Sequence, residues 1–289
     1  MNTVRKAVIP AAGFGTRFLP ATKAQPKEML PVIDTPVIQY VVEEIVKSGI
    51  KEILIITGRG KRAIEDHFDR STELEEMLKE KGKNDAFVKM REIAELADIH
   101  YIRQQEQRGL GDAIHCAKSF TNGEPFVVLL GDTIMQADVP VTKQLINFYN
   151  KYQSSIIAVE QVPREKISRY GIVGGKEVEP GVLELDTLVE KPQPEEAPSS
   201  FGVTGRYLLT PAIFEMIEKT SPGKGGEIQI TDALKLLLQK EKIYAANVKG
   251  KRYDIGNKLD YLKATVELAL QRADLGNDFR SFLQTQVKS

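Results

Sequence analysis

Cysteine and histidine are scarce in this chain, with one cysteine and three histidines among 289 residues. A single cysteine, Cys116, cannot form a disulfide within the chain. The histidines His67, His100 and His115 share no spacing typical of metal ligands, so the sequence does not predict a zinc or di-iron site.

Long hydrophobic runs and net charge are also missing. No apolar run approaches the roughly 18 residues of a membrane span, and residues 1–6 lead into a strand too short for a signal-peptide core. We therefore expect a cytoplasmic protein with no membrane partner. The 40 basic and 40 acidic residues cancel, which argues against a nucleic-acid partner, since such proteins usually carry a basic surface.

The order of apolar segments predicts an α/β fold. Short apolar runs at residues 6–10, 52–57, 98–103 and 126–130 alternate with amphipathic segments, a pattern typical of parallel strands joined by helices. A helix is expected at 36–47, and the charged segment 60–96 reads as surface helices. Further strands are expected at 155–161, 171–174, 182–189, 203–209 and 242–248, with helices at 226–239 and 259–272. We expect a main domain over residues 1–256 and a helical appendage over 257–289, a candidate for oligomerisation.

The loop after the first expected strand has the composition of an anion-binding site. Gly13 and Gly15 allow the backbone to approach a polyanion, and Arg17, Lys23 and Lys27 follow with no acidic residue between Gly13 and Lys27. This pattern predicts a loop that binds phosphate.

Two common phosphate-binding motifs do not match this loop. A dinucleotide fingerprint needs a third glycine where Phe18 stands, which makes a nicotinamide dehydrogenase a poor alternative. A P-loop needs Gly-Lys-Ser/Thr, which Gly15-Thr16 does not supply.

The loop instead resembles the signature of sugar-1-phosphate nucleotidyltransferases. Residues 11–20 read Ala-Ala-Gly-x-Gly-Thr-Arg-x-Leu-Pro, and residues 26–31 read Pro-Lys-Glu-Met-Leu-Pro. From about residue 4 to about residue 270, the chain is similar to the bacterial UTP:glucose-1-phosphate uridylyltransferases, also called UDP-glucose pyrophosphorylases. The resemblance implies a Rossmann-like nucleotidyltransferase fold, with a mixed, mainly parallel central sheet flanked by helices.

The resemblance also implies a reaction and its partners. UTP and glucose 1-phosphate would give UDP-glucose and pyrophosphate by in-line attack on the α-phosphorus, with magnesium (Mg2+) required. UDP-glucose would then supply glycan or cell-envelope synthesis, and the enzyme would be a homo-oligomer, a dimer or a tetramer.

Residue by residue, the resemblance assigns the catalytic cations and the nucleotide site. The catalytic cations are Arg17, Lys27 and Lys191, with Lys23 a less certain further cation. The nucleotide-binding residues are Ala11, Ala12, Gly13, Gly15, Gln104 and Gly109. Gln104 would hydrogen-bond the pyrimidine, because an amide offers both a donor and an acceptor, although the adjoining Gln105 leaves the register open by one.

The metal ligands implied by the resemblance are Asp132 and Asp254. Asp132 follows a strand of buried type and so should lie beyond its carboxyl end, where α/β sheets bind ligands. Most relatives have a second Asp after Gly-Asp, whereas this chain has Thr133, which puts metal affinity and full activity in question.

The sugar site implied by the resemblance consists of Gly171, Glu190, Lys191 and Glu227. Glu190 would accept hydrogen bonds from glucose hydroxyls, and Lys191 would pair with the sugar phosphate. Gly205 and Arg206 are further candidates for lining the site. Two alternatives stay open: a transferase that prefers dTTP or another hexose 1-phosphate, and a UDP-sugar sensor or scaffold with little or no turnover.

Overall fold

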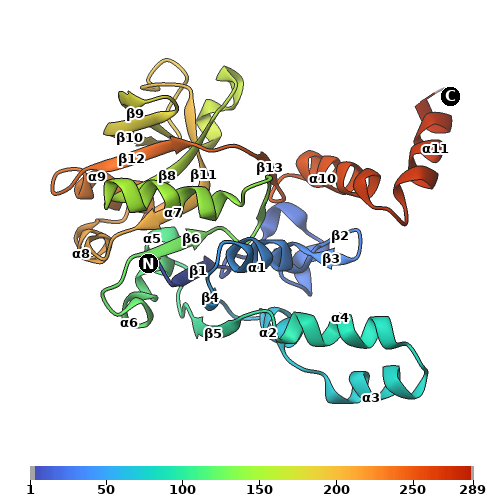
Figure 1. Cartoon of the computed structure of the whole chain (residues 1–289). Helices are drawn as coiled ribbons and strands as arrows, with labels where there is room; N and C mark the ends of the chain where they lie inside the picture. Colours follow the sequence, from blue (N-terminus) through green and yellow to red (C-terminus); the bar gives the residue numbers. More distant parts are fainter. Residues whose placement is uncertain (1–3, 288–289) are drawn as a thin grey trace.

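The computed structural model describes residues 4–287, so the first three and last two residues of the two expected domains lie outside the described range. A nine-stranded sheet forms the centre of the molecule, in the order β5-β4-β1-β6-β11-β8-β12-β10-β9 (Figure 1). Its strands are β1 (Lys6–Pro10), β4 (Glu52–Thr57), β5 (Asp98–Arg103), β6 (Phe126–Leu129), β8 (Ser155–Gln161), β9 (Gly171–Glu179), β10 (Val182–Glu190), β11 (Phe201–Leu209) and β12 (Ile243–Asn247).

The sheet is mixed and mainly parallel, as predicted. Strands β5, β4, β1 and β6 are parallel neighbours, whereas β11 is antiparallel to both β6 and β8. Strand β12 is parallel to β8, and β10 is antiparallel to β12 and β9. Only β10 and β11 therefore run against the other strands of this sheet.

Helices cover both faces of the sheet because the strands present apolar side chains on both sides. One face packs on α1 (Val37–Lys47) and α7 (Val141–Tyr152), for example through Ile9 against Ile38 and Leu145 in one cluster. The other face packs on α5 (Leu110–His115), α8 (Ala212–Lys219) and α9 (Ile230–Leu237), with Val8 and Phe214 in a second cluster. Helix α6 (Lys118–Thr121) lies between α5 and β6 in the chain. The two faces thus have separate cores.

Three helices and a C-terminal pair extend from this body (Figure 1). The charged segment forms α2 (Arg62–Phe68), α3 (Thr72–Glu80) and α4 (Asn84–Ala94), as expected. Helix α10 (Lys258–Gln271) packs on β13 (Lys251–Asp254) and β2 (Pro31–Val32), and α11 (Gly276–Val287) follows α10 at the end of the described chain. Within residues 4–287, no helix combines the length and apolar character needed to cross a membrane.

Several elements differ from the expectation. The helix expected at 226–239 begins only at Ile230, since Gly225 and Gly226 adopt positive φ angles of 77° and 75°. Helices α5, α6, α7 and α8 were not predicted. Nor were two short ribbons, β2 (Pro31–Val32) with β3 (Thr35–Pro36), and β7 (Thr133–Gln136) with β13 (Lys251–Asp254). The second ribbon matters most, because it shapes the candidate site.

Candidate functional site

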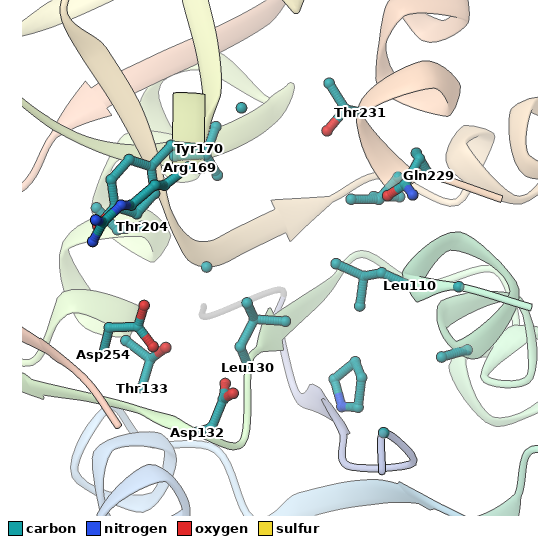
Figure 2. A pocket seen from close by; sticks show the side chains of 18 of the residues that line it. Leu110, Leu130, Asp132, Thr133, Arg169, Tyr170, Thr204, Gln229, Thr231 and Asp254 are labelled. Atoms are coloured by element: carbon teal, nitrogen blue, oxygen red, sulfur yellow. The ribbon is translucent and has the colours of Figure 1, made fainter. Parts of the chain in front are cut away.

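A cleft of about 940 Å³ lies at the carboxyl ends of β1, β5 and β6, where open α/β sheets place their ligand sites. Loops after these three strands form one side, and residues of β10, β11 and the loop before α9 form the other. Figure 2 shows Asp132, Thr133 and Asp254 grouped on one side of the cleft, with Gln229 and Thr231 farther along it. Most residues predicted from separate parts of the sequence therefore meet in one cavity.

The loop after β1 presents backbone amides and cations to the cleft. Ala12, Gly13 and Arg17 line it, and within residues 4–287 the amides of Ala12 and Gly13 donate to no protein acceptor. Gly15 has a left-handed φ of 68°, and its carbonyl accepts a 2.7 Å hydrogen bond from Thr22. Free amides beside a guanidinium are suited to bind phosphate oxygens.

Lys27 and Asp132 form the central ion pair of the cleft. Lys27 Nζ lies 2.5 Å from Asp132 Oδ2, and both side chains are largely buried. Burial alone would lower the pKa of Lys27, but the carboxylates of Asp132 and Glu28 outweigh it and raise that pKa. Burial alone would raise the pKa of Asp132, yet Lys27 and Arg17 hold it below its ordinary value. Both groups therefore remain charged at neutral pH.

A second ion pair, which was not predicted from the sequence, lies next to Lys27. Lys61 Nζ lies 2.8 Å from Glu28 Oε2 with both side chains buried, and Glu28 Oε1 lies 4.0 Å from Lys27 Nζ. Glu28 belongs to the Pro-Lys-Glu-Met-Leu-Pro signature, which was the available signal. Lys61 lies in a charged segment that was expected to be solvated surface, so nothing in the sequence indicated its contact with Glu28.

The β7–β13 ribbon brings Asp254 to Asp132. Asp254 is paired in register with Thr133, the residue after Asp132, and Ile255 N donates to Asp132 O at 2.9 Å. A Cβ built on Gly256 would lie 2.9 Å from Asp254 Oδ1 and 3.3 Å from Asp132 Oδ2, so a side chain here would enter the space beside both carboxylates. Two carboxylates from distant parts of the sequence thus face one small volume.

These two carboxylates fit the demands of a divalent oxygen-binding cation. Burial and the charge of Asp132 raise the pKa of Asp254, which means that the pair repel each other and that a cation between them would be stabilising. No cluster of three or more acidic, histidine or cysteine ligands occurs in the part of the chain that the structure describes. Two carboxylates suffice for magnesium, which takes its remaining ligands from phosphates and water.

The opposite end of the cleft holds the predicted sugar residues. Glu190 Oε1 lies 2.8 Å from Lys191 Nζ, and Glu190 Oε2 accepts a 2.6 Å hydrogen bond from Thr231. Gly171 is paired with Glu190 across β9 and β10, and a Cβ there would lie 3.3 Å from Glu190 Oε2. Glu227 also lines this end, and its carboxylate accepts from Gln229 at 2.9 Å.

Lys191 has an unusual backbone. Its φ is +47°, a left-handed conformation that a residue with a Cβ adopts only at a cost, and its amide donates to Tyr170 O at 3.0 Å. Strained residues of this kind cluster at binding sites, where the surrounding structure maintains them.

Gln104 is fixed in one orientation at the end of β5. Its Nε2 donates to Asp112 Oδ2 at 2.7 Å and to Gly109 O at 3.3 Å. Because a carboxylate only accepts hydrogen bonds, Nε2 must face Asp112, and Oε1 is left as an acceptor. Gln105 is exposed and does not line the cleft, whereas Gln104 does. Gln107, which sequence reasoning missed, also lines the cleft and donates to Ala12 O at 2.6 Å.

Four of the sequence candidates do not line the cleft. Ala11 is buried and its amide donates to Ile56 O, Gly15 lies beneath Lys27 and Thr22, and Lys23 is exposed outside the cleft. Arg206 is fully buried behind the cleft, whereas its neighbour Gly205 does line it. The expectation that Arg206 lines the site is therefore wrong, because its guanidinium turns inward to Glu44.

The charges that line the cleft cancel. Six basic residues, Arg17, Lys27, Lys166, Arg169, Lys191 and Arg252, stand against six acidic ones, Glu28, Asp132, Glu190, Glu227, Asp254 and Asp260. Several are paired directly, for example Arg252 Nε with Glu160 at 2.6 Å just outside the lining.

Comparison with known proteins gives consistent matches along the chain. The family model for nucleotidyl transferases matches residues 6–271. The chain is 53% identical over 285 residues to the UTP–glucose-1-phosphate uridylyltransferase YngB of Bacillus subtilis, covering 99% of this chain and 96% of that protein. Among solved structures, it is similar to a UDP-glucose pyrophosphorylase complexed with UDP-glucose, with a TM-score of 0.86 and 45% identity, covering 93% of this chain and 100% of the other. It is also similar to the UTP-bound enzyme of Acinetobacter baumannii, with a TM-score of 0.90 and 38% identity, covering 97% and 99%.

Proposed function

The chain belongs to the nucleotidyl transferase family, and from that premise we propose that it makes UDP-glucose and pyrophosphate from UTP and glucose 1-phosphate. The resemblance expected from the sequence is confirmed by relatives of about half identity over nearly the full length. The observation that carries the proposal is one cleft lined by the glycine loop with Arg17, by the carboxylates of Asp132 and Asp254, and by the Glu190–Lys191 pair. The same observation supports the roles of individual residues given below.

The reaction is a direct displacement at phosphorus. A phosphate oxygen of glucose 1-phosphate attacks the α-phosphorus of UTP, the bond from the α-phosphorus to its bridging oxygen breaks, and pyrophosphate leaves with that electron pair. No covalent enzyme intermediate is needed, so the protein acts by positioning and by electrostatic stabilisation.

The triphosphate binds at the loop after β1. Arg17 and Lys27 offset the charge that develops on the attacked phosphoryl group and on the leaving pyrophosphate. The free amides of Ala12 and Gly13 hold phosphate oxygens, and the carbonyl of Gln104 accepts the N3–H of uracil. Thymine presents the same N3–H, so this contact does not separate UTP from dTTP.

Glucose 1-phosphate binds at the other end of the cleft. Glu190 accepts hydrogen bonds from sugar hydroxyls, and Lys191 pairs with the phosphate, which brings its oxygen toward the α-phosphorus. The positive φ of Lys191 supports a binding role, because residues with strained backbones cluster at functional sites.

We propose that Asp132 and Asp254 would hold the divalent metal that nucleotidyl transferases of this family generally use, and that this metal is magnesium. When bound, magnesium neutralises phosphate charge and orients the triphosphate. Thr133 stands where the resemblance leads us to expect a further aspartate after Asp132, and both proposed ligands, Asp132 and Asp254, are present.

The C-terminal residues 257–289 are proposed to join a second copy of the chain into a homo-oligomer. Helix α11 projects from the body in Figure 1, and Leu275 and Phe282 are 39% and 53% exposed. Light scattering on the wild type and on Phe282→Glu tests this. An oligomer that dissociates in the variant is expected, and a monomeric wild type would overturn it.

The test of the proposed activity is pyrophosphate release with magnesium across UTP, dTTP, CTP, ATP and GTP, each with several hexose 1-phosphates. Preference for UTP with glucose 1-phosphate is expected. Preference for dTTP or another hexose would identify the related transferase instead. Binding of UDP-glucose by folded protein without turnover would identify a sensor.

A further inference from the structure

A buried arginine lies directly behind the carboxylate side of the cleft. Arg206, on β11, is 0% exposed, and its Nη2 lies 2.8 Å from Oε2 of Glu44 on α1. Glu44 also accepts from the backbone and hydroxyl of Thr142, at 3.1 and 2.7 Å, at the start of α7. The ion pair therefore joins α1, α7 and β11 in the core.

The guanidinium also reaches two backbone carbonyls on either side of Asp132. Arg206 Nη2 donates to Thr133 O at 2.7 Å, and Nη1 donates to Leu130 O at 3.4 Å. Its remaining donors go to Glu44 and to Gly205 O. Every N–H group of the guanidinium is thus hydrogen-bonded. Two of these groups bond residues 130–133, a segment that we call the Asp132 turn.

The Asp132 turn has few other internal supports. Thr133 N donates to Leu130 O at a long 3.4 Å, and Leu130 N donates to Gly205 O at 3.0 Å. Gly131 contributes no side chain to anchor the turn, since a Cβ there would lie only 3.3 Å from Glu28, Ile38 and Ile9. The short backbone contacts come from Arg206 Nη2, which bonds Thr133 O at 2.7 Å behind the turn, and from β13 in front, where Ile255 N bonds Asp132 O at 2.9 Å. Lys27 holds the side chain of Asp132 but no backbone carbonyl of the turn.

We propose that Arg206 is a positioning residue, which fixes the Asp132 turn so that the carboxylates of Asp132 and Asp254 converge on one metal ion. The inference rests on the proposed function, because it concerns the metal site of the same reaction. Thr133 carries the effect to Asp254, since its carbonyl accepts from Arg206 and the residue pairs with Asp254 across the ribbon.

The chemistry of the side chain favours this role over a purely structural one. A buried ion pair contributes little net stability compared with apolar side chains of the same size, so stability alone does not account for its presence. The planar guanidinium spreads five N–H donors over three nitrogens and so reaches a carboxylate and carbonyls that lie apart, whereas the three donors of a lysine ammonium sit on a single nitrogen.

The main test compares two variants of the full-length protein. Arg206→Lys keeps the charge opposite Glu44 but loses the fork that reaches Leu130 and Thr133. The matched control, Thr142→Val, removes one hydrogen bond to the same Glu44 and leaves the Asp132 turn untouched. Each variant is first characterised by its thermal midpoint, so that the loss of stability is known for both.

Two readouts separate positioning from stability. We expect Arg206→Lys to weaken binding of manganese in the presence of UTP, measured by electron paramagnetic resonance, by roughly 10- to 100-fold, as for other residues that orient metal ligands. The magnesium concentration for half-maximal activity should rise by the same factor. Thr142→Val should change neither by more than about twofold. Equal metal responses in the two variants would overturn the proposal.

A further variant covers the case in which Arg206→Lys does not fold. The double variant Glu44→Leu/Arg206→Met replaces the ion pair with apolar side chains and removes both carbonyl bonds. Weakened manganese binding in folded double variant supports the positioning role, and wild-type binding contradicts it. Wild-type UDP-glucose formation is measured alongside, so failure of the proposed function shows in the wild type, whereas failure of this inference shows only in the variants.

Discussion

Replacement of Lys27 by alanine is the most direct test of the phosphate-binding end of the cleft. Lys27 lies 2.5 Å from Asp132 and its side chain is 22% exposed, so it acts in a partly desolvated site. Two unit charges about 4 Å apart interact by roughly 4 kcal/mol at an effective dielectric constant near 20, which sets a ceiling. A charge-assisted hydrogen bond contributes about 1.5–3 kcal/mol net, so Lys27→Ala should lower turnover roughly 10- to 150-fold.

The assay is steady-state pyrophosphate release at saturating UTP, glucose 1-phosphate and magnesium. Lys23→Ala is the matched control, because Lys23 is a nearby lysine that is exposed and does not line the cleft. Circular dichroism would establish that both variants are folded. The reasoning is refuted if Lys27→Ala retains turnover within about twofold of wild type, or if Lys23→Ala loses as much.

Three further predictions follow from the geometry. Asp254→Asn should weaken metal binding by about tenfold or more and leave the thermal midpoint equal or higher. The reason is that burial and the nearby charge of Asp132 raise the pKa of Asp254, so its negative charge is unfavourable in the folded protein. A lower thermal midpoint with normal metal titration would contradict this. Lys191→Gly should raise the KM for glucose 1-phosphate, because the lysine contact with the phosphate is lost. It should not lower the thermal midpoint, since glycine adopts a positive φ without strain. An unchanged KM argues against the phosphate contact. Burial lowers the pKa of His67, so below about pH 6.5 the unfolded chain binds a proton that the folded chain does not. The free energy of unfolding should therefore fall as the pH drops from about 7 to 5.5. Thermal melts of His67→Gln should show a smaller fall, and an identical fall would rule out His67 as the cause.

The local parts of the site could be predicted from the sequence. One short stretch of sequence contains the strand that ends at Pro10, the glycines after it, and the cations Arg17 and Lys27. Their joint chemistry can therefore be inferred without knowing the fold. Asp132 was placed correctly at the cleft because a buried strand ending in Gly-Asp fixes both the direction and the end of that strand. Short-range pattern located this loop, but it did not separate the residues that line the cleft from Ala11, Gly15 and Lys23, which do not line it.

Features that depend on pairing between distant segments could not be derived in the same way. The neighbourhood of Asp254 depends on the β7–β13 ribbon, whose four-residue strands carry too little periodicity to predict their partner. Lys61 and Gln107 lie in polar segments that resemble solvated surface, and only the tertiary fold directs them to Glu28 and Ala12. Arg206 was misplaced for the related reason that a buried charge is exceptional, and sequence does not show its counter-charge 162 residues away.

The balance of charges in the cleft gives a physical reason for a metal requirement. Lining cations and anions are equal in number, and Lys27 and Lys191 are each bonded to a lining carboxylate. Such pairs hold the side chains in place before substrate arrives, but they provide no excess positive charge for two phosphate-bearing substrates. Bringing those substrates together in a partly desolvated cleft is therefore unfavourable unless further positive charge enters with them. The divalent cation that we propose on Asp132 and Asp254 would supply that charge and would also relieve the repulsion that contributes to the raised pKa of Asp254.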